Sequence, residues 1–305
     1  MTQEELENQQ LKSAENTYGP APKLDLSKVK NTEAAKTKNN ISNDFAKTVE
    51  TASKKARKSK FCFTEEHEIQ IPTNGLLYQD SEDEDIKRGI VRLQPMSLAD
   101  EEIIANQTYI KNGSVFRHLL NNCMLNKFDA KDFAPYDTYY LLYALRRITY
   151  GEDYKFEVQC PECGKKYTYE LDISDVEFDE LKPEDNAKSK CTIKLPVSKF
   201  TVVINMVTTG TEEEVNRLSK TIDAGDAILN FVARTESITD NKGDPVNPND
   251  FADFYEALPG KDRAEISKHF KVIDDLKIPT VDLICPKCGE EDEMQIPFNR
   301  DFFRY

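Results

Sequence analysis

The spacing of hydrophobic residues along the chain changes at about residue 61. Before that point, single apolar residues are scattered through a stretch rich in Lys, Asn, Thr, Ala and Ser. Such a stretch cannot bury enough surface to offset the entropy cost of ordering it. Residues 1–60 are therefore predicted to form an arm that is disordered, or ordered only by a partner. The arm ends in a basic cluster made up of Lys54, Lys55, Arg57, Lys58 and Lys60.

Short strands are predicted directly after the arm. Their patterns cover residues 61–63, 68–71 and 90–93, and residues 73–75 indicate a turn. The acidic run at 81–85 lacks the spaced ligands and the glycine of a calcium loop. We therefore interpret it as the solvated tip of a hairpin.

Three helices are predicted next. Ser97 and Asp100 have the spacing of a capping box, which begins a helix that ends at Gly113. Two apolar stripes at helical spacing indicate the other two helices. Arg146 and Arg147 close the third helix and are interpreted as ordinary helix-end cations. The stripes consist of Val115, Phe116, Leu119, Leu120, Cys123 and Met124, and of Tyr140, Leu141, Ala144, Leu145 and Ile148.

Residues 172–280 mix strand and helix patterns. Two strands are expected over 191–195 and 200–207, and Thr211 with the three glutamates after it resembles a capping box for a helix that continues through Ile222. The remaining expected features are an apolar run over 227–232, a hairpin tip at 240–244, a short helix from Asn249 or Asp250 to Leu258, and a helix over 261–276.

Composition and charge narrow the functional classes. The chain has 305 residues, a net charge of −14 and a mean hydropathy of −0.65. No apolar stretch approaches the roughly 20 residues of a membrane span, and the N-terminus lacks the apolar core of a secretory signal, so we expect a soluble chain made in a cytosol. The arm carries +4 and residues 61–305 carry −18. This acidity argues against a protein that mainly coats nucleic acid. The basic cluster is accordingly interpreted as a solvated linker end or as a docking site for an acidic partner, with nucleic-acid binding ranked third.

Four of the seven cysteines form two nearly identical words. Cys160 and Cys163 lie in CPECG, and Cys285 and Cys288 lie in CPKCG, each word flanked by strand patterns. Two residues between cysteines let one tight turn aim both sulfurs at a single ion, and the following glycine lets backbone N–H groups turn toward the thiolates. Two such turns supply the four sulfurs of a closed structural zinc site.

Alternatives to zinc are weaker. A redox dithiol needs one pair, usually at a strand-to-helix junction, and disulfides are rare in a cytosol. An iron site is compatible with the same four sulfurs. A catalytic zinc is disfavoured because four thiolates leave no position open for water. We therefore predict one structural Zn²⁺ per chain, bound by Cys160, Cys163, Cys285 and Cys288.

The two words are separated by residues 164–284, a gap of 121 residues, against roughly 15–20 in a compact ribbon. If one ion is shared, a whole α/β insert must begin and end at nearly the same point of the cysteine ribbon. Two separate ions would need extra ligands. His67, His118 and His269 are isolated and lack metal spacing, and Cys62 and Cys191 have no partner word.

These patterns together predict an α+β fold. A small helical and β core carries a split four-cysteine zinc ribbon, built from two CPxCG knuckles, with a mixed α/β insert between them. The expected parts are the arm (1–60), a β/helical part with the first knuckle (61–171), the insert (172–280), and the second knuckle with an aromatic tail (281–305). The tail aromatics are expected to dock into the chain's own core or to contact a partner: Phe298, Phe302, Phe303 and Tyr305.

The motifs of common enzymes are missing from the sequence. It contains no GxxxxGK[ST], GxGxxG, HExxH or GxSxG word. It holds only three histidines, so the commonest acid–base side chain is scarce. Acidic residues are abundant, but no carboxylate pair stands out. We therefore do not expect an enzyme.

Several segments resemble the baseplate-hub and tail-assembly proteins of T-even-like contractile-tailed bacteriophages. The most specific is the approach to the first knuckle at 140–151, YLLYALRRITYG. The likeness covers about residues 61–305, is patchy over 175–225, and leaves out the arm. Tyr305 stands where the family usually has Pro after FFR, a departure that concerns only the docking of the tail. The other matching segments are IPTNG at 71–75, LQPM at 93–96, LPGKD at 258–262 and DFFRY at 301–305.

The resemblance implies a structural or assembly component of a phage tail baseplate that acts through protein–protein contacts. Its implied partners are other baseplate and tail proteins, reached through the arm or the C-terminal aromatics, with no membrane and no small-molecule substrate. Its implied location is the host cytoplasm during assembly and then the virion tail. Two alternatives stay open, namely a transient tail-assembly chaperone and a zinc-ribbon nucleic-acid-binding protein.

Overall fold

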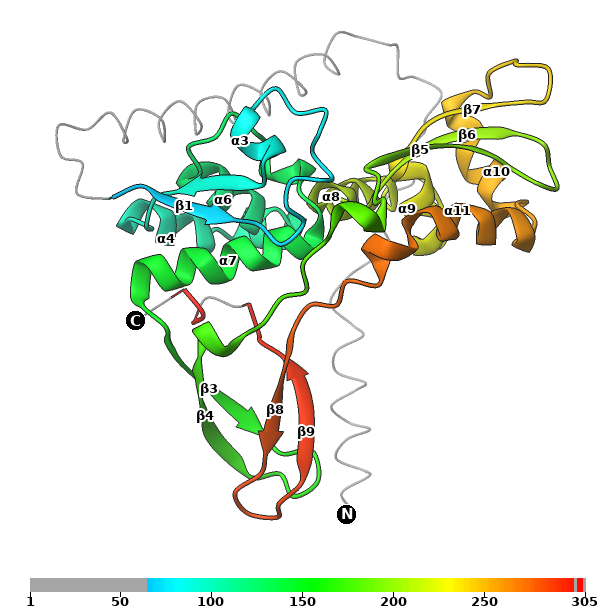
Figure 1. Cartoon of the computed structure of the whole chain (residues 1–305). Coiled ribbons are helices and arrows are strands. Elements are labelled where there is room, and N and C mark those ends of the chain that lie inside the picture. Colours follow the sequence, from blue (N-terminus) through cyan, green and yellow to red (C-terminus); the bar gives the residue numbers. More distant parts are fainter. Residues whose placement is uncertain (1–64, 299–300, 304–305) are drawn as a thin grey trace, which may run out of the picture. The chain divides into compact units, whose positions relative to one another are not determined.

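The computed structural model describes residues 65–298 and 301–303, which all belong to one structural unit (Figure 1). The predicted arm, its basic cluster, the strand at 61–63 and Tyr305 lie outside the described residues. None of the helices within residues 65–298 combines the length and the apolar character of a membrane span. The first elements in chain order are β1 (His67–Gln70), α3 (Glu84–Lys87), β2 (Ile90–Leu93), α4 (Leu98–Ile104), α5 (Gln107–Asn112), α6 (Val115–Cys123), η2 (Ala130–Asp132) and α7 (Pro135–Tyr150).

The strands β1 and β2 pair antiparallel, but the acidic run between them is not a solvated hairpin tip. Its last two residues begin the one-turn helix α3, which Asp83 caps by accepting hydrogen bonds from the backbone N–H groups of Asp85 and Ile86. The other oxygen of Asp83 accepts from the backbone N–H of Lys127 at 2.9 Å. The carboxylate of Asp83 therefore caps α3 and also ties it to the segment that follows α6.

The region predicted as one helix between Ser97 and Gly113 forms two. Ser97 and Asp100 make the expected capping box of α4. The chain then turns at Asn106, whose side chain accepts from the first N–H groups of α5, and Gly113 ends α5 with a φ of 71°. An internal Asn can cap a new helix as readily as it can sit within one, and apolar spacing alone did not register this break.

The IPTNG segment is tied to α7 by a buried carboxylate. Asp137 is fully buried and accepts from the backbone N–H of Thr73 at 3.3 Å and from its hydroxyl at 2.6 Å. The hydroxyl of Tyr78 also donates to Asp137. Gly75 has a φ of 72°, and a Cβ atom there would lie 2.3 Å from a backbone oxygen of α3. The turn thus requires both its Thr and its Gly.

The strands around the two knuckles form two separate hairpins, each an antiparallel two-stranded sheet, as the flanking patterns predicted. Figure 1 shows the two hairpins side by side. A hydrogen bond from the Tyr169 hydroxyl to the Asp282 carbonyl joins them at 3.2 Å. The strands are β3 (Asp153–Gln159), β4 (Lys166–Asp172), β8 (Thr280–Ile284) and β9 (Glu291–Gln295).

The region between the hairpins is a three-stranded antiparallel sheet in the order β5-β6-β7 with helices packed against it. Its first helix begins earlier than expected, because Thr208 is the capping residue and Thr211 is its partner three positions on. The elements are η3 (Ile173–Asp175), η4 (Pro183–Asp185), β5 (Lys190–Lys194), β6 (Thr201–Asn205), α8 (Thr209–Leu218), α9 (Asp226–Arg234), β7 (Thr235–Thr239), η5 (Pro248–Asp250), α10 (Phe251–Glu256) and α11 (Gly260–Asp274).

This insert is attached to the core at several points. On the outgoing segment, the backbone N–H of Leu181 donates to the Pro72 carbonyl at 2.9 Å. The hydroxyls of Thr138 and Thr209 lie 2.6 Å apart, which joins α7 to α8. The fold is therefore α+β, with an intervening α/β region between the two cysteine pairs, as predicted.

The tail returns from the second hairpin to the core. Phe302 and Phe303 have exposed fractions of 0% and 1%, so this part of the tail docks within the chain and is not available to a partner. Phe298 is half-buried and packs on α7, with its ring 5.1 Å from that of Tyr143. Docking into the chain's own core, one of the two expectations, is correct for Phe302 and Phe303, whereas Phe298 packs on the core and keeps part of its ring accessible.

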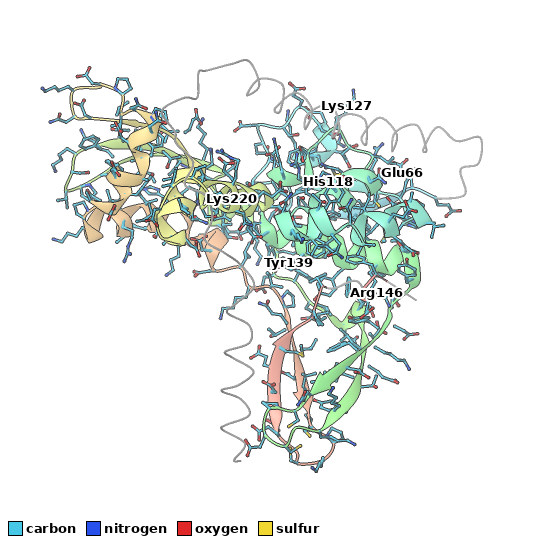
Figure 2. The ribbon with its side chains drawn as sticks, turned by 180° about the vertical axis from the view of Figure 1, so that it is seen from behind. Glu66, His118, Lys127, Tyr139, Arg146 and Lys220 are labelled. Carbon is cyan, nitrogen blue, oxygen red and sulfur yellow. The ribbon has the colours of Figure 1, made fainter. Side chains whose placement is uncertain are left out.

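Arg146 is not an ordinary helix-end cation. Its side chain is only 4% exposed, donates to the Asp153 carbonyl at 2.7 Å, and lies over the rings of Tyr154 and Phe302 at 5.1 and 5.7 Å. Figure 2 shows Arg146 where the helical part meets the hairpins. The guanidinium thus links the end of α7, the start of β3 and the tail, and burial lowers its pKa.

Candidate metal centre

The two CPxCG words fold into the same turn. In the first, the backbone N–H of Cys160 donates to the Lys165 carbonyl at 2.9 Å, and the N–H of Gly164 donates back to the Cys160 carbonyl at 3.0 Å. In the second, Cys285 and Gly289 repeat these bonds, with an N–H from Cys285 to the Glu290 carbonyl at 2.9 Å. The two glycines have φ values of 66° and 75°, a conformation that other residues rarely adopt.

The turns bring all four sulfurs together. The Sγ atoms of Cys160, Cys163, Cys285 and Cys288 all lie within 4.8 Å of one another. Two contacts cross between the hairpins, namely Cys160 to Cys288 at 3.6 Å and Cys163 to Cys285 at 3.7 Å. A disulfide needs a sulfur separation of about 2.05 Å, so the cysteines are not bonded to each other. A tetrahedron with metal–sulfur bonds of about 2.3 Å has edges of about 3.8 Å. The cross-hairpin distances are close to that edge.

The electrostatics of the cluster also fit a cation. A backbone N–H from Cys288 donates toward the sulfur of Cys285 and lowers the pKa of that thiol to about 6. For Cys288, a backbone N–H from Glu290 lowers the pKa, but the three neighbouring sulfurs outweigh it and raise the pKa to about 12. Four thiols this close cannot all ionise unless a positive charge lies among them.

The centre is closed on its inner side and open to solvent at its tip. Cys160 and Cys285 are buried, Cys163 is half-buried and Cys288 is exposed. The N–H to carbonyl bonds of the turns hold the sulfurs in place, and no carboxylate or histidine from the described part of the chain joins the cluster. With four protein ligands, an ion here would stabilise the fold without taking part in catalysis.

The other candidate residues lie elsewhere. The ring of His118 stacks on that of Tyr109, with centroids 3.9 Å apart, and His269 contacts Glu265 at 3.5 Å. His67 is on β1, and Cys191 is buried on β5. Within residues 65–298 and 301–303, the four cysteines are the one group of three or more metal-binding side chains close enough to share an ion.

A model of a protein family described as T4 bacteriophage base plate protein matches residues 77–304. The chain belongs to this baseplate family. No curated protein and no solved structure gives a significant match. The match spans both CPxCG words and ends inside the aromatic tail, so it includes everything that forms the cluster. Phage baseplate proteins of this family are typically structural rather than enzymatic.

Structural roles now explain the motifs by which the chain resembles other baseplate proteins. In LPGKD, the carboxylate of Asp262 is buried and accepts from the backbone N–H groups of Val197 and Ser198 at 2.7 and 2.8 Å, fixing the β5–β6 turn to the start of α11. Asp137 and Arg146 are the comparable buried groups of the core. Sequence reasoning missed all three, since charged residues are usually exposed.

Proposed function

We propose that this chain is a structural or assembly component of the hub region of a phage tail baseplate and acts through contacts with other baseplate proteins. The observation that carries the proposal is the family match over most of the described residues. The hairpins carry more acidic than basic residues, and the buried charged groups Asp137, Arg146 and Asp262 anchor distant segments of the fold. Its location would be the host cytoplasm during assembly and then the virion tail.

We further propose that the four cysteines bind one structural Zn²⁺. The proposal is supported by four sulfurs within 4.8 Å of one another, at cross-hairpin distances near the edge of a zinc tetrahedron. The ion would join two segments that are 121 residues apart in the sequence. It would therefore hold the insert's entry and exit together.

Two measurements test the metal assignment. Elemental analysis of protein purified without oxygen should give one zinc per chain, and X-ray absorption should give four sulfur neighbours at about 2.3 Å. Two zincs per chain, or none, would refute the shared site. Iron in place of zinc would refute the choice of metal and leave the ligands unchanged.

The role in the baseplate is tested on purified particles. Mass spectrometry of intact virions should detect the chain, and phage lacking it should fail to form complete baseplates. If the chain is detected in assembly intermediates but not in virions, it would instead be a transient tail-assembly chaperone, one of the two alternatives that the sequence left open.

A nucleic-acid-binding ribbon is disfavoured by charge. Near the knuckles, three lysines are outnumbered by five acidic residues: Lys165, Lys166 and Lys287 against Glu162, Glu290, Glu291, Asp292 and Glu293. Phosphate contacts depend on clustered cations, which this surface does not offer. A salt-sensitive complex with DNA or RNA in a filter-binding titration would overturn this preference.

A further inference from the structure

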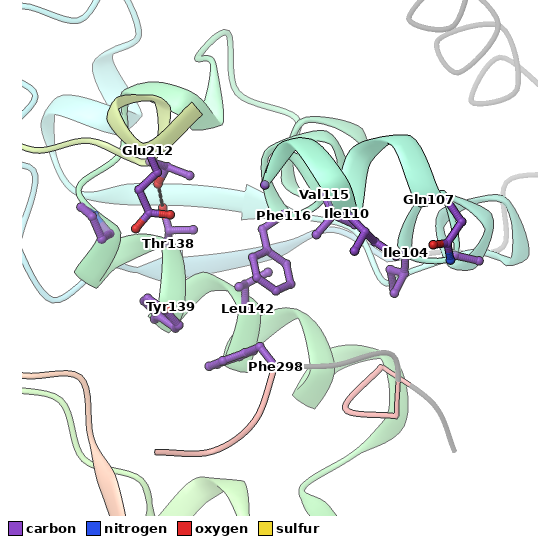
Figure 3. A pocket seen from close by; sticks show the side chains of 14 residues that line it. Ile104, Gln107, Ile110, Val115, Phe116, Thr138, Tyr139, Leu142, Glu212 and Phe298 are labelled. Atoms are coloured by element: carbon purple, nitrogen blue, oxygen red, sulfur yellow. Dashed lines mark hydrogen bonds between the residues drawn. The ribbon is translucent and has the colours of Figure 1, made fainter. Parts of the chain in front are cut away.

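An apolar groove lies beside α7, away from the metal centre. Its volume is about 500 Å³, within the range of clefts that bind ligands. Figure 3 shows Phe116, Leu142 and Phe298 near its middle, with Ile110 toward one end. The residues that line it are Ile104, Ala105, Gln107, Ile110, Gly113, Val115, Phe116, Pro135, Thr138, Tyr139, Leu142, Thr209, Glu212 and Phe298.

The lining of the groove has few polar side chains, and two of them, Thr138 and Thr209, are hydrogen-bonded to each other. Because these two hydroxyls bond to each other, they do not need a hydrogen bond from a bound partner. Glu212 is the one charged side chain in the lining, and it is exposed. Among residues 65–298 and 301–303, no cation forms an ion pair with it. Its charge raises the pKa of Tyr139 further, beyond the larger effect of burial.

The groove also exposes apolar surface. Ile110 lines the groove and is 48% exposed, on the short helix α5, which has no buried residue. The walls come from α4, α5, α6, α7 and the start of α8 together with the tail, and no strand contributes. A partner strand would find no sheet edge to pair with, whereas an amphipathic helix can lay apolar side chains between helices.

We propose that this groove binds an amphipathic helix of another baseplate protein. The helix would place apolar side chains one turn apart over Ile110, Phe116 and Phe298. A Lys or Arg on the same helix would meet Glu212 at the end of the groove. Glu212 in the lining and the net charge of −18 over residues 61–305 both favour a basic segment over an acidic one. The proposal rests on the proposed baseplate function and adds the site and the chemistry of the partner.

Site-specific photocrosslinking tests this proposal. A benzophenone amino acid replaces Ile110 in the full chain. Host cells produce this variant while they are infected with phage that lack the wild-type copy. Val272 carries the same probe as a control, because it is 39% exposed and does not line the groove. The crosslinked segment in purified baseplates is then sequenced by mass spectrometry.

The expected result is a crosslink from Ile110, and not from Val272, to another baseplate protein. The crosslinked segment should carry apolar residues at helical spacing and a Lys or Arg within one turn. Glu212→Lys should lower the crosslink yield on the order of tenfold, because it replaces attraction by repulsion. Glu212 is exposed and makes no ion pair in the described chain, but it lies in the first turn of α8, where a carboxylate is favoured. The variant should therefore unfold at a slightly lower temperature than the wild type and remain folded at the temperature of the crosslinking assay.

Several results would overturn the proposal. These are a crosslink to a second copy of this chain or to its own residues, an acidic partner segment, equal yields at both positions, or a yield that Glu212→Lys leaves unchanged. The chain's presence in the same baseplates is measured separately. If the chain is present in baseplates but gives no crosslink from position 110, the proposal that the groove binds a helix is refuted and the proposed function stands. If the chain is absent from every baseplate preparation, the proposed function is refuted.

Discussion

The buried carboxylate of Asp137 gives the sharpest stability prediction. Burial raises its pKa from 3.8 to about 6, although the side chain and backbone of Thr73 and the hydroxyl of Tyr78 donate to it and pull the pKa down. A carboxyl whose pKa is raised on folding binds its proton more tightly in the folded state. Its contribution to stability is therefore complete below pH 3.8 and is lost as pH rises through about 6.

The magnitude follows from the shift. A difference of about two pKa units at 1.36 kcal/mol per unit gives about 3 kcal/mol over the full titration, and somewhat less between pH 4 and pH 7. Asp137→Asn keeps the shape and removes the titration. The amide oxygen can accept from Thr73, and the Tyr78 hydroxyl, which already accepts from the backbone N–H of Ala134 at 3.0 Å, can turn to accept from the amide as well.

The assay is urea unfolding of both proteins from pH 4 to pH 7. The unfolding free energy of Asp137→Asn, minus that of the wild type, should rise by about 2 to 3 kcal/mol across this range. Taking the difference cancels every other titrating group, including the cysteine cluster. A flat difference, or one that falls with pH, would refute the reasoning, because it would mean that the three donors outweigh burial.

Three further predictions concern the cluster, a turn and the tail. Cys160→Ser should lose the bound zinc and lower the thermal unfolding temperature, whereas Cys191→Ser should keep a full zinc content; equal zinc loss in both would mean that the ligands are wrongly assigned. Gly75→Ala should lower the free energy of unfolding, measured with denaturant, by at least about 3 kcal/mol, because the new Cβ would lie 2.3 Å from a backbone oxygen. The control variant Gly243→Ala has open space around the new Cβ and should lower the free energy of unfolding by about 1 kcal/mol. Phe302→Ala removes a fully buried ring and should cost about 3–5 kcal/mol in the same assay, and a cost below 1 kcal/mol would argue against tail docking.

The sequence was most informative where a pattern maps directly onto geometry. The CPxCG words predicted two like turns and one four-sulfur cluster, because the spacing of two cysteines and a glycine leaves the turn little choice. Apolar stripes placed α6 and α7 correctly, since a 3.6-residue period with one buried face has a single interpretation.

The rest depends on contacts between distant residues. Asp137, Arg146 and Asp262 look like surface charges in the sequence, and only packing reveals that each is buried against partners far along the chain. The break at Asn106 and the one-turn helix after Asp83 depend on a single side chain accepting nearby N–H groups, which periodicity does not register. The groove beside α7 needs five segments and the tail, so no local pattern could indicate it.

The distance between the two cysteine pairs sets an order of events during synthesis. When Cys160 and Cys163 leave the ribosome, they can offer a metal only half of its ligands, and the second half arrives more than 120 residues later. The helices of the core and the sheet of the insert can pack in that interval. An ion held by all four sulfurs would then be captured only after these elements have packed, and it would lock them in place. Metal supply in the infected cell would accordingly control how many chains finish maturing, rather than how many begin.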